Sequence, residues 1–198
     1  MKTLYDGKTK TVLADEESGG VWLLFKDDAT GENGVFDPGS NTVGGSVDGK
    51  GKIGLIISRY FFNLMAENGI PTHCLGADID RCLMQVRKLT VPKLEFVLRY
   101  FTAGSMCRRF TLEEGIPFDP PYLEVTLKDD ERQDPLITDD ALEMLGIMTK
   151  DEYKVLVDLT RRIGNVVKDE LVKKEMELYD IKFEFGRVGE DNHIALID

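Results

Sequence analysis

The order of strand-like and helix-like segments is the feature that most constrains this fold. Apolar runs at residues 82–87, 94–100 and 122–128 predict β-strands. Apolar residues at helical spacing predict one helix that starts near Ile53 and stops at Gly69, and a longer one after the capping box at Thr149. The two kinds of segment do not alternate regularly, as they would in a βαβ sheet. The sequence therefore predicts an α+β fold.

The composition excludes several functional classes. The chain has 198 residues and is 42% hydrophobic, which is enough for a buried core. A net charge of −11 gives no general basic field, so we expect no nucleic-acid partner, while a small anionic ligand remains compatible. Three cysteines without a CxxC pair indicate reduced thiols in a cytoplasmic protein, and no apolar run reaches the ~18 residues of a membrane span. With only two histidines, carboxylates, lysines and arginines must carry any chemistry.

Further segments predict the organisation of the two ends of the chain. Lys8 and Lys10 fall on one face of an extended segment, and a Gly19-Gly20 turn leads into a strand at 21–25, so we expect an opening β-hairpin. Residues 31–51 are rich in glycine and predict a long loop, a mobile flap. Residues 178–185 and 194–198 predict a closing hairpin.

The first candidate site is a row of alternating charges near the C-terminal end. Asp180, Lys182 and Glu184 point to one face of a strand, because successive side chains in a strand alternate. Asp198 lies across from this strand in the predicted hairpin. Two such carboxylates can share Mg²⁺, so Glu184 and Asp198 are metal candidates. The alternative is a solvated sheet face beside a buried one.

The second candidate site is Gly7-Lys8-Thr9-Lys10, where two ammonium groups beside a glycine could bind a polyphosphate. The alternative interpretation is that the exposed lysines only prevent an edge strand from pairing with another strand. The third runs from Arg99 through Ser105 to Arg109, and a serine at a helix start with nearby guanidinium groups suits a phosphomonoester. There the alternative is that Ser105 only caps the helix. Asp134, which follows Lys128-Asp129-Asp130, reads by itself as a surface turn.

Taken together and in order, these motifs resemble the SAICAR synthetase family. The resemblance covers nearly the whole chain and rests on residues 4–10, 25–30, 49–51, 69–72, 99–105, 113–115, 128–130, 134–135 and 180–186. It implies a two-lobed fold with an ATP cleft between the lobes. A small antiparallel β lobe, residues 1–88, would bind ATP, and a larger α/β lobe, residues 89–198, would bind substrate and metal.

The resemblance also implies a reaction and a role for each candidate residue. The reaction is the ATP- and Mg²⁺-dependent joining of L-aspartate to carboxyaminoimidazole ribonucleotide, by a cytoplasmic enzyme that is a homo-oligomer. The implied ATP-binding residues are Lys8, Lys10, Val86 and Lys88. The implied substrate-binding residues are Arg99, Ser105, Lys128, Asp134, Asp180 and Lys182. Glu184 and Asp198 are the implied metal ligands.

Two departures from the family pattern leave alternatives open. Gly54-Leu55 stands where the family usually has two asparagines, and the family pattern continues beyond Asp198. We therefore expect either that the sequence is a piece of a longer chain or that it is a shortened paralogue that binds nucleotide without catalysis. A related ATP-dependent ligase or kinase that acts on another carboxylate is a further alternative.

Overall fold

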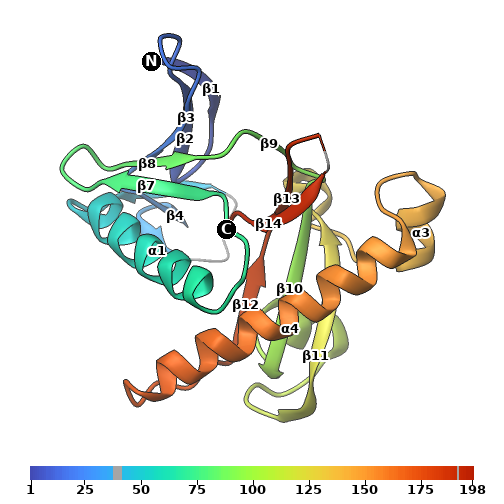
Figure 1. The fold of residues 1–198 in the computed structure, drawn as a ribbon. Coiled ribbons are helices and arrows are strands. Elements are labelled where there is room, and N and C mark those ends of the chain that lie inside the picture. Colours follow the sequence, from blue (N-terminus) through green and yellow to red (C-terminus); the bar gives the residue numbers. More distant parts are fainter. Residues whose placement is uncertain (38–41, 191) are drawn as a thin grey trace. The chain divides into compact units, whose positions relative to one another are not determined.

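The computed structural model describes residues 1–37, 42–190 and 192–198. The chain divides into two compact units (Figure 1). The first comprises Met1–Thr90 with Arg187–His193, and the second comprises Val91–Gly186 with Ile194–Asp198. The boundary predicted from the sequence lies between residues 88 and 89 and stays a prediction.

The first unit is built mainly of antiparallel strands. Its five-stranded sheet has the order β1-β2-β3-β8-β7, and a smaller sheet has the order β5-β4-β6. Among the described residues of this unit, the one long helix is α1 (Lys50–Glu67). The strand bounds are β1 (Lys2–Asp6), β2 (Lys10–Ala14), β3 (Val21–Phe25), β4 (Asp28–Glu32), β5 (Val35–Phe36), β6 (Val43–Ser46), β7 (Cys74–Asp78) and β8 (Leu83–Val86).

The second unit is centred on a three-stranded antiparallel sheet of order β11-β10-β12, with helix α4 lying across it in Figure 1. A further sheet has the order β14-β13-β9, and the paired residues of β13 and β9 belong to the first unit. The bounds of the remaining elements are β9 (Leu89–Thr90), β10 (Leu94–Phe101), α2 (Ser105–Phe110), β11 (Pro117–Leu127), the 3₁₀-helix η1 (Asp130–Arg132), α3 (Asp139–Met144), α4 (Lys150–Val172), β12 (Asp180–Phe183), β13 (Phe185–Val188) and β14 (His193–Leu196).

The predicted α+β class is confirmed, as are the strands at β8, β10 and β11 and the helix α4. The hydroxyl of Thr149 accepts a hydrogen bond of 3.2 Å from the backbone N–H of Glu152, which caps α4 as the sequence predicted. The apolar stripe of α4 packs on one face of the central sheet. Gly164 makes this approach possible, because a Cβ there would lie 2.3 Å from Cδ2 of Leu98.

The loop predicted at residues 31–51 is wrong for most of the described part of that range. Strands β5 and β6, the end of β4 and the start of α1 all lie within it, while residues 38–41 lie outside the described residues. The glycines serve close backbone approach here: a Cβ on Gly44 would lie 2.7 Å from Cα of Gly31 on the paired strand. Helix α1 also starts earlier than predicted, since the carboxylate of Asp27 accepts the backbone N–H of Gly51 at 2.8 Å.

The predicted closing hairpin is only partly correct. Strand β12 pairs with β10, whereas β13 pairs with β14, and Glu184 exchanges backbone hydrogen bonds with the last two residues of the chain. These two residues, Ile197 and Asp198, face the single residue Glu184, which separates β12 from β13. The strand predicted as continuous is therefore divided at Glu184.

Candidate functional site

The charged residues singled out in the sequence meet on one face of the sheet β11-β10-β12. In β10, Glu95, Val97 and Arg99 point to this face, while Phe96, Leu98 and Tyr100 point to the face that α4 covers. Across the register, Glu95 lies opposite Thr126, and Arg99 lies opposite Asp180. The alternation predicted for residues 180–184 is confirmed, and it places polar groups of three strands side by side.

At one end of this face, two arginines share a buried carboxylate; we call this the arginine end. The side chains of Arg99 and Glu124 are 4% and 2% exposed. Nε and Nη2 of Arg99 donate to Oε1 of Glu124 at 3.2 and 3.0 Å, and Nη2 of Arg109 donates to Oε2 at 2.5 Å. Arg99 also pairs with Asp180. Such charge-assisted, bidentate contacts fix the guanidinium planes.

Ser105 belongs to the arginine end and does not cap its helix. Gly104 is the N-cap of α2, and Ser105 is the first helical residue. Its Oγ accepts hydrogen bonds from Nη2 of Arg99 at 3.4 Å and from Nη1 of Arg109 at 3.2 Å. The interpretation of Ser105 as a simple helix cap is therefore wrong, and its hydroxyl lies where two guanidinium groups converge.

At the other end of the face, which we call the lysine end, the carboxylates are buried and the cations are half exposed. Lys182 pairs with Glu95, and Lys128 pairs with Glu184. The lysine side chains are 51% and 46% exposed, against 6% and 8% for their partners. Burial alone would lower the pKa of Lys128, but its hydrogen bond to Glu184 and the charges of Glu184, Glu95 and Asp198 outweigh burial and raise that pKa.

The backbones of the two metal candidates, Glu184 and Asp198, are joined by a hydrogen bond. The N–H of Glu184 donates to the carbonyl of Asp198 at 3.0 Å, and the charges of both residues act on Lys128. Carboxylate oxygens are the ligands that Mg²⁺ prefers, so this donor pair fits part of a magnesium site. Within the described ranges, no group of three or more Asp, Glu, His or Cys could hold a metal ion, so the remaining ligands would come from water and substrate.

Asp134 lies in the turn after β11. Its Oδ1 accepts the backbone N–H of Asp129 at 2.8 Å, and its own N–H donates to the carbonyl of Asp129 at 3.0 Å. These are the contacts of a surface turn, which is also what the sequence around Asp134 predicts when it is considered alone. They fix the position of Asp134 beside the end of β11.

The candidates of the first unit lie at two places in its larger sheet. Lys10 begins β2, with Nζ 5.3 Å from the ring centre of Phe25, whereas Lys8 lies in the turn before it, so the prediction of one shared strand is wrong. Because β2 lies between β1 and β3, Lys10 does not protect a sheet edge. Val86 ends strand β8 and is buried, and Lys88 follows it in the segment before β9.

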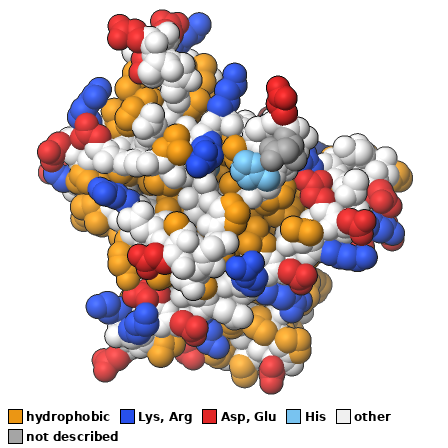
Figure 2. All heavy atoms as spheres, viewed as in Figure 1, with side chains coloured by type: hydrophobic (Ala, Val, Ile, Leu, Met, Phe, Trp, Pro, Cys, Tyr) orange, Lys and Arg blue, Asp and Glu red, His pale blue; other side chains and the backbone are white. Residues whose placement is uncertain are grey.

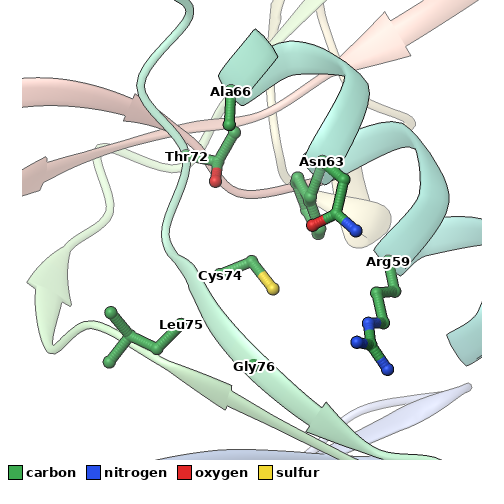
Figure 3. Close-up of a pocket in the computed structure, with 8 residues that line it drawn as sticks. Arg59, Asn63, Ala66, Thr72, Cys74, Leu75 and Gly76 are labelled. Atoms are coloured by element: carbon green, nitrogen blue, oxygen red, sulfur yellow. The ribbon is translucent and has the colours of Figure 1, made fainter.

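A pocket of about 160 Å³ lies elsewhere in the first unit, between α1 and β7 (Figure 3). Arg59 and Asn63 of the helix and Cys74 of the strand point toward it. It is smaller than the ~300–1,000 Å³ of most ligand sites, and none of the sequence-predicted site residues lines it. The chemistry suggested by the sequence therefore lies outside this pocket.

The surface carries both signs of charge. Lys and Arg side chains are interspersed with Asp and Glu over the face seen in Figure 2, rather than gathered into one basic field. Among the described residues, no helix is long and apolar enough to cross a membrane.

Sequence reasoning missed two members of the charged face, Glu95 and Glu124, which pair with Lys182 and with the two arginines. On β10, Glu95 and Arg99 point to the same face, because every second side chain of a strand does so. On β11, Glu124 points to the same face as Tyr122 and Thr126 for the same reason. The alternation along each strand could therefore have indicated both carboxylates. Which strands would pair was not visible in the sequence.

Comparisons with known proteins agree in the family they indicate. The model of the family described as SAICAR synthetase matches residues 3–198. A phosphoribosylaminoimidazole-succinocarboxamide synthase of Clostridium tetani is 52% identical over 202 aligned residues, which cover 100% of this chain and 88% of the relative. The synthase of Finegoldia magna is 36% identical, with 100% and 82% covered.

Solved structures show the same likeness. The synthase from Ehrlichia chaffeensis superposes with a TM-score of 0.90 at 28% identity, covering 100% of this chain and 81% of that one. A SAICAR synthetase in complex with ADP gives a TM-score of 0.85 at 34% identity, covering 98% and 78%.

Proposed function

The chain belongs to the SAICAR synthetase family, and from that premise we propose which of its residues carry out the family's reaction. It is an ATP-dependent ligase of purine biosynthesis. The match over residues 3–198 and the 52% identity to a curated synthase favour this activity over a nucleotide-binding paralogue or a ligase for a different acid.

The reaction has two chemical steps. A carboxylate oxygen of carboxyaminoimidazole ribonucleotide attacks the γ-phosphorus of ATP, so that an acyl phosphate forms and ADP leaves. The amine of L-aspartate then attacks the acyl carbon, the amide bond forms, phosphate leaves and the amine loses a proton. Both steps bring anionic groups together, so the protein must supply positive charge and hold the reacting atoms in line.

The charged face of the sheet β11-β10-β12 is the observation that carries this proposal. At the arginine end we assign Arg99 and Ser105 to the 5′-phosphate of the nucleotide, because a positive charge fixed beside a hydroxyl group attracts a phosphate. Lys128, Asp134, Asp180 and Lys182 contact the imidazole and ribose part. The ammonium groups of these half-exposed lysines have three N–H donors each, so they can bind substrate oxygens while they keep their carboxylate partners.

In the first unit we assign the ATP contacts. Lys8 and Lys10 bind the polyphosphate as point charges, and Gly7 between them and β1 permits close backbone approach, since a Cβ there would lie 2.9 Å from the carbonyl oxygen of Lys10. The backbone around Val86 and Lys88 contacts the adenine. The position of Lys10 inside the sheet, rather than on its edge, supports this role.

Mg²⁺ is the cofactor that Glu184 and Asp198 would hold. When bound, it neutralises charge on the triphosphate and on the substrate carboxylate. This assignment is supported by the charges of both residues, which help to raise the pKa of Lys128 and would also favour a divalent cation at this place.

We also propose that the enzyme is a cytoplasmic homo-oligomer. The reduced state of Cys74, Cys82 and Cys107 suits the cytoplasm. An exposed apolar row on α1 supports self-association: Ile53, Ile56, Ile57 and Tyr60 are each about half exposed. Light scattering on the purified protein tests this, and a monomer at micromolar concentration contradicts it.

The activity is tested by measuring ADP release with ATP, Mg²⁺, aspartate and carboxyaminoimidazole ribonucleotide. We expect release that depends on both the nucleotide substrate and aspartate, with the succinocarboxamide detected by mass spectrometry. Normal binding of both nucleotides without ADP release would instead show a binding protein. ADP release with another amino acid in place of aspartate would change the assigned amine.

A further inference from the structure

We propose that Glu95 is a positioning residue for the ligase reaction: it fixes the ammonium group of Lys182 and acts on the reaction through that lysine. This inference rests on the proposed function of the same sheet face. It adds a residue that the sequence motifs did not single out, and it assigns a task to a carboxylate that is 4% exposed.

Both carboxylate oxygens of Glu95 have a partner. Oε1 accepts a hydrogen bond from Nζ of Lys182, and Oε2 accepts one from Oγ1 of Thr126 at 3.3 Å. Thr126 is directly opposite Glu95 on β11, so the sheet itself orients the carboxylate. A buried carboxylate is costly unless it is paired, which means that Glu95 retains its cation firmly.

Lys182 needs such an anchor. Its side chain is 51% exposed and comes from β12, at the edge of the three-stranded sheet. A free lysine side chain carries about 2 kcal/mol of rotamer entropy, so its ammonium would move through many positions. A cation stabilises a transition state best when it is already in place, because no reorganisation is then required during the reaction.

The negative charge of Glu95 also has an opposite effect on binding. It lies next to the ammonium that attracts an anionic substrate, so it weakens the ground-state attraction while it fixes the geometry. Removing the charge should therefore lower kcat without raising the KM for the nucleotide. A merely structural defect would raise KM and lower stability together.

The test compares Glu95→Gln, Lys182→Met and the double variant in steady-state kinetics. We expect E95Q to reduce kcat by about ten- to a hundredfold, the range found when partners that orient a functional ligand are removed. The KM for the nucleotide should stay the same or fall. The double variant should be no slower than K182M alone, because a residue that acts through Lys182 has no effect once the lysine is gone.

Glu124→Gln is the matched control, because Glu124 is a buried carboxylate of the neighbouring strand that points to the same face but pairs with arginines. We expect E124Q to raise KM and to combine additively with K182M. Glu95→Asp keeps the carboxylate on a side chain that is one methylene group shorter. It should therefore recover part of the kcat that E95Q loses. Should E95Q fail to fold, E95D in the same cycle with K182M decides the question.

A readout without catalysis separates this inference from the proposed function. Reductive ¹³C-methylation of lysines gives each one an NMR signal, and K182M identifies the signal of Lys182. We expect that signal to lie apart from those of mobile lysines in the wild type and to join them in E95Q. An unchanged signal, or a double variant slower than K182M by the full E95Q factor, overturns the inference. An absence of ADP release by the wild type would overturn only the proposed function.

Discussion

The two ends of the charged sheet face balance charge in opposite ways. At the arginine end the cation is buried: Arg99 is 4% exposed and lies against Glu124, which is 2% exposed. At the lysine end only the carboxylates are buried, and the ammonium groups of Lys128 and Lys182 are about half exposed. The arginine end is therefore closed to solvent before any substrate arrives, whereas the lysine end holds its ammonium groups with N–H donors still open to solvent.

The largest effect is expected from Arg99→Met. This substitution leaves Glu124 buried with Arg109 as its remaining guanidinium partner, and breaking a buried ion pair costs about 3–5 kcal/mol. Urea unfolding measures this loss of stability. Arg108→Met is the control, since Arg108 is an exposed residue of helix α2, next to Arg109, and its loss should change stability by less than about 0.5 kcal/mol. Equal stability of R99M and R108M would mean that the arginine end is not a fixed anchor.

A second comparison sets Glu124→Gln against Glu95→Gln. Glutamine at 124 can accept from one guanidinium but must turn its amide N–H₂ toward the other, so we expect a loss of about 2–3 kcal/mol. Glutamine at 95 should cost about 1 kcal/mol, because its partner Lys182 can turn to water. The measurement is the urea concentration at the unfolding midpoint of each variant, compared at equal m values, so that a lower midpoint means lower stability. A greater loss in E95Q would reverse the assigned rigidity of the two ends.

The contrast between the ends also explains what the sequence could predict. The row Asp180, Lys182 and Glu184 was visible because a period of two fixes the face of a strand. The partners of that row were not, since Lys182 and Glu95 are 87 positions apart and only strand pairing brings them together. The strands among the glycines of 31–51 were missed for a related reason: glycine there serves close packing of two backbones rather than a turn.

Ser105→Ala tests the surface of the arginine end with a smaller change. It removes the hydroxyl that accepts from Arg99 and Arg109, which should cost about 1 kcal/mol of stability. If this hydroxyl also contacts the substrate phosphate, the KM for the nucleotide rises by about five- to tenfold while kcat stays nearly constant. Ser105→Thr keeps a hydroxyl and should recover part of the affinity. A fall in kcat at unchanged KM would place Ser105 in the chemical step instead.

The smallest effect on stability is expected from Lys182→Met. Because Lys182 is half exposed, water can reach Oε1 of Glu95 in this variant while Thr126 still donates to Oε2, so the loss should be less than about 1 kcal/mol. Activity should fall far more than stability, in contrast to R99M, where both fall together. Thermal unfolding and ADP release on the same samples make this comparison. A stability loss in K182M as large as that in R99M would show that the ion pair of the lysine end is as shielded from solvent as that of the arginine end, and its N–H donors would then not be open to substrate.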